Sequence, residues 1–183
     1  AARSISPKAS TRWRDMADSI AAPEKRPYMT HYDGHGNRID RIVRPRETEI
    51  IEREIFGEAL FSEKTPPWVK LIKMYLVYQN GEACVACPMT CTEGMVELLR
   101  KFADTPELER VLAHTAEGID GEFAIGAQYL SEIQGGSDVP SNVLEAVREG
   151  GARRLYGTKF FCSATHADYA VVTAKPAGSE KVA

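Results

Sequence analysis

The hydrophobic pattern of this chain changes period near Gly118, and no other feature constrains the fold as strongly. Between residues 47 and 117, apolar residues recur every three or four positions, as on one face of a helix. After Gly118 they alternate with other residues, as in strands, over 122–130, 143–148, 153–162 and 169–174. Because the helices come first and the strands follow, we predict an α+β fold with antiparallel strands.

Prolines and capping residues divide the helical half. Pro66 and Pro67 separate a helix over 47–62 from one over 68–79, and further helical segments span 82–92 and 92–102. Thr105 and Pro106 are typical of the N-cap and first position of another helix. The 68–79 segment is apolar on most sides, so we predict that it is buried among other helices.

The first 45 residues form a basic arm with little regular periodicity. Residues 1–46 hold ten Lys and Arg against five Asp and Glu, whereas the whole chain has a net charge of −3. The turn residues 33–37 predict a hairpin of strands 28–33 and 38–43, and residues 16–22 suggest a short helix. The arm is interpreted as a solvated extension, with docking onto phosphates or another subunit as the alternative.

Bulk properties exclude several classes of protein. A net charge of −3 argues against nucleic-acid coating through charge alone, and no apolar run has the length of a membrane helix. No secretory signal is visible, so we expect a cytoplasmic protein. The Ala, Ser and Arg content of residues 1–22 raises the alternative of a mitochondrial transit peptide and a matrix location.

Three cysteines invite a metal hypothesis. Cys84, Cys87 and Cys91 would share one helical face and could hold zinc or part of an iron–sulfur cluster. Cys162 lies far away in the sequence and Pro88 interrupts the helix, so we favour buried structural thiols. His31 and His35 lack a third ligand nearby and are assigned to a surface hairpin. We predict no metal site.

The stretch 130–138 follows a predicted strand and breaks into glycines and short polar residues. Gly135 and Gly136 permit close approach of another molecule, and Ser131, Ser137 and Asp138 can form hydrogen bonds from a turn. Such a loop suits a phosphate or a flat polar ring, although the composition alone favours a plain hairpin turn.

Two motifs in order decide between these interpretations. Residues 130–138 (LSEIQGGSD), here called the first motif, resemble the T/S-E-x-x-x-G-S-D pattern of acyl-CoA dehydrogenases. Residues 157–163 (GTKFFCS), the second motif, resemble the G-x-K-x-[W/F]-x-[T/S] pattern of that family. The details are closest to the AidB-like branch, and the resemblance covers about residues 40–175.

The resemblance implies a domain order. Family members have an N-terminal helical domain, a middle β domain of antiparallel, barrel-like form and a C-terminal helical bundle that carries the catalytic glutamate. We therefore expect an arm over 1–45, a helical domain over 46–118 and a partial β domain over 119–183, without the bundle. The exposed sheet edge expected at the end of the chain agrees with an incomplete β domain.

The resemblance also implies a site. Leu130 and Ser131 should meet the pyrimidine side of FAD, and Phe161 should cover one side of the ring. Gly136 and Ser137 should lie near the pyrophosphate or the acyl thioester, which makes Ser137 a substrate-binding residue as well. Ser163 should donate to flavin N5. No catalytic residue is expected in this chain, because the family's catalytic glutamate belongs to the C-terminal bundle. The resemblance implies a structural role for Glu132.

Three functions remain open from the sequence. The first is α,β-dehydrogenation of an acyl-CoA thioester, with FAD as hydride acceptor and a homotetramer as the assembly. The second is an AidB-like flavoprotein with a protective or DNA-associated role. The third is a non-catalytic assembly module, which would need neither a base nor a complete β domain. The electron-transfer partner is not indicated by any residue pattern.

Overall fold

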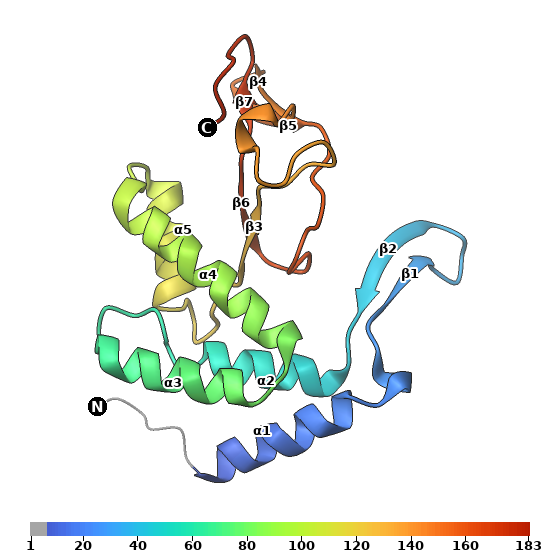
Figure 1. Ribbon diagram of the computed structural model, residues 1–183, viewed down its shortest axis with the longest axis vertical. Helices are drawn as coiled ribbons and strands as arrows, with labels where there is room; N and C mark the ends of the chain where they lie inside the picture. The colour runs from blue at the N-terminus through green and yellow to red at the C-terminus, as the bar shows by residue number, and fades with distance from the viewer. Residues whose placement is uncertain (1–6) are drawn as a thin grey trace.

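The computed structural model describes residues 7–183 and separates into a helical part and a β part (Figure 1). The helices come first in the chain and the strands of the β part follow, so the predicted α+β class is confirmed. No helix within the described residues has the length and apolarity needed to cross a bilayer.

The N-terminal arm is more ordered than predicted. Residues Pro7–Ile20 form a long helix, α1, where only a short helix over 16–22 was expected; residues 1–6 lie outside the described residues. Trp13 is 4% exposed, and its indole N–H donates to Glu54 Oε2 at 2.7 Å. The side of α1 that carries Trp13 is thus part of the core, and the interpretation of the arm as a solvated extension is wrong for this helix.

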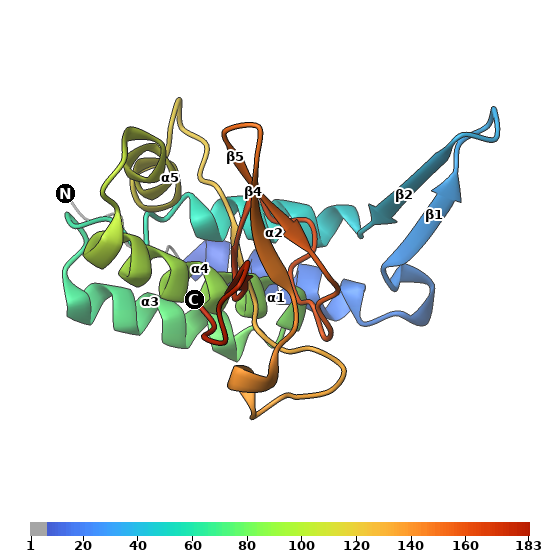
Figure 2. The same ribbon diagram turned by 90° about the horizontal axis from the view of Figure 1, so that it is seen from above.

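The predicted hairpin is confirmed and stands away from the body. Strands β1 (Tyr28–Tyr32) and β2 (Arg38–Val43) pair antiparallel, and Figure 2 shows them projecting to one side. Asp33 Oδ1 accepts the backbone N–H groups of His35 and Asn37 at 2.8 and 2.9 Å, which fixes the turn. These hydrogen bonds, led by that from the Asn37 side chain, lower the pKa of Asp33.

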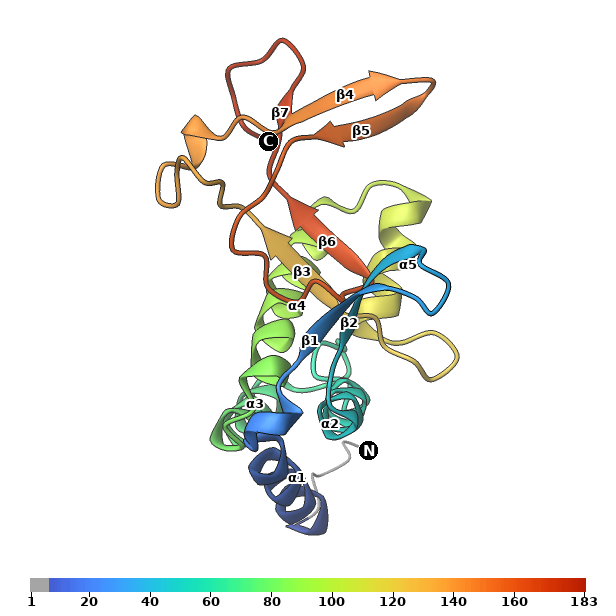
Figure 3. The same ribbon diagram turned by 90° about the vertical axis from the view of Figure 1, so that its right-hand side faces the viewer.

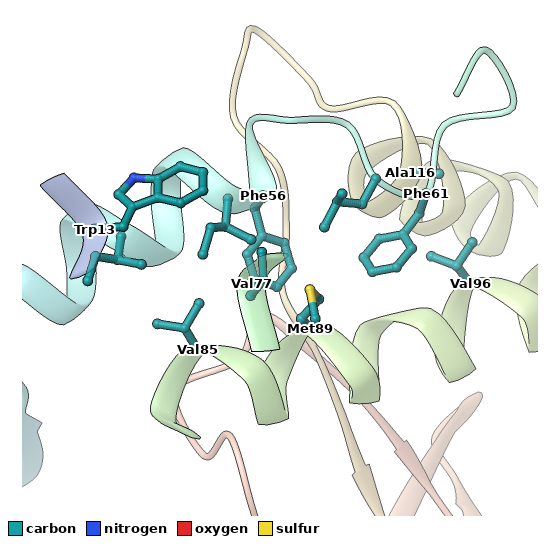
Figure 4. Packing of buried hydrophobic residues seen from close by; sticks show 11 residues of the cluster. Trp13, Phe56, Phe61, Val77, Val85, Met89, Val96 and Ala116 are labelled. Carbon is teal, nitrogen blue, oxygen red and sulfur yellow. The ribbon is translucent and has the colours of Figure 1, made fainter. Parts of the chain in front are cut away.

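Four further helices build the core (Figure 4). They are α2 (Arg46–Phe56), α3 (Pro67–Gln79), α4 (Ala83–Phe102) and α5 (Pro106–Ala116). Helix α2 ends at Phe56 instead of residue 62, yet Leu60 and Phe61 after it are still buried. The segments 82–92 and 92–102 are one helix, because Pro88 lies in its second turn and leaves the helix unbroken. Thr105 caps α5 as predicted, accepting from Leu108 N–H at 3.3 Å.

Two predictions about burial in the helical part are wrong. Helix α3 buries only Lys73 and Val77 well, while Trp68, Leu71 and Tyr75 are 60–69% exposed. Lys73 is buried because its ammonium donates to Glu58 at 2.8 Å, so a charged residue occupies part of the inner face. The cysteines of α4 are not buried thiols, since Cys84 and Cys87 are exposed and Cys91 is half-buried.

The β part contains two small sheets in place of one antiparallel array (Figure 3). Strands β3 (Gly126–Tyr129) and β6 (Tyr169–Val172) pair in parallel. Strand β4 (Glu145–Glu149) pairs antiparallel with β5 (Ala152–Tyr156) and in parallel with the short β7 (Lys175–Pro176). Within the β part, the prediction of antiparallel pairing therefore holds only for the hairpin of β4 and β5.

Candidate flavin-binding surface

The structure brings the two motifs into contact. The first motif leaves the end of β3, and the second follows β5 through Gly157. The N–H of Phe160 donates to the carbonyl of Ser131 at 2.9 Å, which joins the two loops directly. Gly157 has a φ of 144°, and a side chain there would lie 2.9 Å from Leu144 Cα, so this start of the second motif requires glycine.

A buried ion pair lies beneath the two loops. Lys159 Nζ donates to Glu132 Oε1 at 2.8 Å, and both side chains are almost fully buried, with 6% and 1% exposed. Glu132 also accepts the backbone N–H groups of Val143 at 2.7 Å and Leu144 at 3.2 Å. Every buried charge here has a partner, as stability in a low-dielectric interior requires.

These contacts control the protonation of Glu132. Burial alone would raise the pKa of this carboxyl group. Together, the hydrogen bonds from Lys159, Val143 and Leu144 outweigh this effect of burial and lower the pKa of Glu132 to about 2. Glu132 is therefore an ionised acceptor at neutral pH, which agrees with the structural role implied for it.

The carbonyl of Leu130 is held from three sides. Asn142 Nδ2 donates to it at 2.7 Å, Lys159 Nζ at 3.2 Å and Thr173 Oγ1 at 3.3 Å. The amide of Asn142 is fully buried, and its donors bridge the first motif to the end of β6. This network fixes the peptide between Leu130 and Ser131, the point where the strand turns into the loop.

The predicted contact residues lie at the surface above this network. Phe161 is 84% exposed and has a φ of 59°, while Leu130 is 39% exposed. Within residues 7–183, the hydroxyl groups of Ser131, Ser137 and Ser163 have no hydrogen-bond partner. A Cβ atom at Gly136 would have no other atom within 4 Å, and Gly136 does not adopt a positive φ.

This surface fits a flat ring with polar edges. Three large apolar side chains of the two loops are exposed. Besides Phe161, these are Ile133 in the first motif, which is 78% exposed, and Phe160 in the second, which is 54% exposed. Free hydroxyl groups next to exposed apolar surface are what a bound ring system needs for cover and orientation. The residues present therefore fit FAD, the group that the resemblance implies.

Sequence reasoning missed the supporting residues. Lys159 lies inside the second motif but received no role, and Asn142 and Thr173 belong to neither motif. The lysine within a largely apolar and aromatic segment was a usable signal, because a buried lysine requires a partner. Nothing in the sequence singled out Asn142 and Thr173.

A cavity of about 620 Å³ lies elsewhere. Arg44, Glu52 and Phe56 line one side of it, and the loop around Asp120 and Phe123 lines the other. It shares no residue with either motif. The predicted contact residues are thus separate from this cavity.

Comparison with known proteins gives relatives of one kind. One relative is AidB of Escherichia coli, whose name describes it as an acyl-CoA dehydrogenase. The chain is 26% identical to it over 167 residues, which cover 83% of this chain and 31% of the relative. It is 27% identical to acyl-CoA dehydrogenase family member 11 of Caenorhabditis elegans over 174 residues, 85% of this chain and 27% of the relative. This chain resembles the acyl-CoA dehydrogenases.

Two solved structures share the fold of this chain. The apo form of Bd2924 superposes with a TM-score of 0.80 at 26% identity, covering 94% of this chain and 36% of that one. Caenorhabditis elegans ACDH-11, solved in complex with C11-CoA, gives a TM-score of 0.78 at 24% identity, covering 93% and 30%, and this likeness concerns the fold. No family model matches the chain. The chain spans about a third or less of the length of the curated relatives it matches.

Proposed function

We propose that the two motifs form one wall of an FAD site in a protein of the acyl-CoA dehydrogenase type. The observation that carries the proposal is the pairing of free hydroxyl groups with an exposed Phe161 on loops held together by the Phe160 to Ser131 hydrogen bond. FAD, when bound, supplies a ring that accepts a hydride. The proposal includes the division into a helical domain over 46–118 and a β domain over 119–183, and a homo-oligomeric assembly.

The residues of this chain would bind and orient the ring. Ser131 and Ser163 would donate hydrogen bonds to its polar edge, and Phe161 would exclude water from one side. The network around the Leu130 carbonyl would hold Ser131 in place, because Asn142 and Lys159 fix the preceding peptide. Preorganised donors of this kind need no rearrangement when charge develops on their partner.

We propose acyl-CoA as the substrate class. A structural relative, ACDH-11, is solved in complex with C11-CoA, which supports this choice. Ser137 is exposed and has no partner among the described residues, so it is the proposed contact to the thioester or the pyrophosphate. No residue of this chain is proposed as the catalytic base. Glu132 is unsuited to that role because its oxygens are occupied and its pKa of about 2 makes it a weak base.

Titration with FAD tests the proposal, with flavin fluorescence as the measurement. Ser163→Ala should weaken binding about fivefold to tenfold, the cost of one hydrogen bond of roughly 1 kcal/mol. Ser131→Ala should act in the same direction. Ser19→Ala is the control, because Ser19 lies on α1 in the helical part, where its hydroxyl group accepts a hydrogen bond from Lys25. Absence of flavin binding by the unaltered protein, or equal binding by Ser163→Ala, would contradict the proposed site.

A further inference from the structure

The hairpin of β1 and β2 projects from the rest of the molecule and has no packing partner of its own (Figure 2). Its strands pair with each other and make no extensive contact with another helix or strand of residues 7–183. A two-stranded hairpin alone is marginally stable in water. Four of its large apolar side chains are 44–62% exposed, namely Tyr28, Met29, Tyr32 and Ile39. The hairpin therefore presents a surface that suits burial against a partner.

The free charge of the hairpin is positive. Asp33 is used internally, because it holds the turn. Asp40 is also used, since it accepts from Arg38 at 2.7 Å and lies 2.8 Å from His31 Nδ1. Arg41 is exposed, and within residues 7–183 its guanidinium has neither an ion pair nor a hydrogen bond. The hairpin thus offers an unpaired cation on a surface that also exposes aromatic rings.

The strand register places this cation and an aromatic ring on one face. Arg41 lies opposite Thr30, and Tyr28 lies opposite Val43. Opposite residues of an antiparallel pair share a face, and so do residues two apart along a strand. Tyr28 and Arg41 therefore lie on the same face of the hairpin. Tyrosine and arginine are among the residues that contribute most to protein–protein interfaces.

The cavity beside α2 has the complementary character. Its volume is about 620 Å³, and Phe56 and Phe123 contribute apolar surface to its lining. Of its two lining arginines, Arg44 is bound to Glu52, whereas Arg53 has no ion pair among the described residues. Three lining carboxylates have no partner within residues 7–183, namely those of Glu49, Asp120 and Glu122. Three free carboxylates against one free guanidinium leave an excess of negative charge, which suits the face that carries Arg41.

The hairpin is not placed to fill the cavity of its own chain. Arg44 lines that cavity, and only Arg44 and Pro45 separate β2 from α2, so the base of the hairpin is fixed beside it. A second copy offers the same cavity without this restriction. Residues 1–46 hold ten Lys and Arg against five Asp and Glu, whereas the remainder holds thirteen against twenty-one. The basic arm of one copy is therefore attracted to the acidic body of another.

We propose that the hairpin of β1 and β2 docks into the cavity beside α2 of a second copy of this chain. Arg41 pairs with the free carboxylates of that cavity, and Tyr28 packs on its apolar lining. The exchange is reciprocal in a twofold dimer, so each copy gives one hairpin and receives one. This inference rests on the homo-oligomeric assembly within the proposed function, which it deepens by naming the surface, and it is independent of the flavin site.

Sedimentation velocity over a concentration series tests the docking. The unaltered chain should dimerise, and Arg41→Glu should raise the dissociation constant of the dimer about 30-fold or more, because a negative charge then meets the acidic cavity. Combining Arg41→Glu with Glu122→Arg should restore part of the lost affinity, since both signs are then reversed. Lys101→Glu makes the same charge change at an exposed position of α4 and is the control, which should dimerise as the unaltered chain does.

Three results would overturn the docking. One is an unaltered chain that stays monomeric up to its solubility limit. Another is unchanged dimerisation of Arg41→Glu, which would place the contact between copies elsewhere and leave the homo-oligomer intact. The third is a combined variant that dimerises no more tightly than Arg41→Glu.

Two further measurements separate this inference from its alternatives. A monomeric chain that binds a single-stranded oligonucleotide, with the binding lost in Arg41→Glu, would assign the hairpin to phosphates and overturn the dimer. Circular dichroism of each variant should match the unaltered chain, because the changed side chains are exposed. FAD titration of Arg41→Glu should be unchanged, so failure of the docking is distinguishable from failure of the flavin site.

Discussion

Glu132 shows how one residue holds two loops together. Its carboxylate accepts from Lys159 in the second motif and from the N–H groups of Val143 and Leu144 before β4. Because the pair is buried, removing one partner leaves an uncompensated charge in the interior. The residue therefore supports the proposed flavin surface through the fold, without touching a ligand.

The pKa of Glu132 leads to a prediction about acid stability. Since the folded-state pKa of about 2 lies below the usual 4.5, ionised Glu132 stabilises the fold fully above about pH 4.5, and this contribution of about 3 kcal/mol is lost as the pH falls toward 2. Glu132→Gln should be less stable at pH 7 and should lose less stability between pH 4.5 and 2. Urea unfolding across this range measures both effects. Glu180→Gln, at an exposed position, should keep the pH dependence of the unaltered protein.

The sequence identified the residues of the surface better than their support. Both motifs were recognisable, and the backbone hydrogen bond from Phe160 to Ser131 joins their two loops. The contacts of Asn142 depend on how β6 returns beside β3, which no local pattern encodes. Ala164 adopts a φ of 53°, a conformation that asparagine tolerates better than alanine.

At the scale of elements, α3 shows that an apolar sequence pattern does not by itself predict a buried helix. Its apolar residues predicted a buried helix, yet the inner face is filled partly by Lys73 and the outer face is exposed. Composition therefore could not tell which side meets the core. The pairing of β3 with β6 was missed for a related reason, because alternation reveals a strand but does not reveal the strand beside it.

A matched pair of leucine-size truncations tests the burial of the two helices. Ile51→Ala on α2 should cost about 2–5 kcal/mol, because Ile51 is 0% exposed and the lost side chain leaves a cavity. Leu71→Ala on α3 should change stability by less than about 0.5 kcal/mol, since Leu71 is 69% exposed. The free energy of unfolding from denaturant titration measures both. A large loss for Leu71→Ala would show that the outer face of α3 is covered in solution.

The contact between α4 and β3 depends on a glycine. A Cβ on Gly126 would collide with the side chain of Met95 and lie 3.2 Å from Thr92 Cα, a backbone atom that cannot move freely. Gly126→Ala should therefore cost about 1–3 kcal/mol through overpacking. Gly34→Ala is the control, because nothing lies within 4 Å of a Cβ there. Thermal unfolding compares the two, and equal melting temperatures would contradict the tight packing of β3 on α4.

At the scale of the whole molecule, a polar cluster ties the helical part to the β part. Arg44 follows the N-terminal hairpin, Glu52 lies on α2, and His166 belongs to the loop before β6. Arg44 Nη1 lies 2.9 Å from both carboxylate oxygens of Glu52 and 3.0 Å from His166 Nε2. His166 Nε2 is 2.9 Å from Glu52 Oε2. Arg44 and Glu52, which are eight positions apart, thus meet a loop residue that lies 114 positions after Glu52, and the resemblance to known proteins gave no indication of this contact.

The cluster predicts a local effect of His166→Ala. The loop around residue 166 should lose its tie to α2, and its backbone hydrogen exchange should accelerate about fivefold to tenfold, as expected for one lost hydrogen bond. Exchange in α2 should stay slow, because Arg44 still neutralises Glu52 after the change. Asp168 and Tyr169 should keep the end of the loop in place through their bonds to Ile125. Hydrogen-exchange mass spectrometry resolves these segments, with His35→Ala in the exposed hairpin turn as the control. If exchange rises equally in α2, the imidazole is part of the cooperative core, and the two parts of the molecule unfold as one unit.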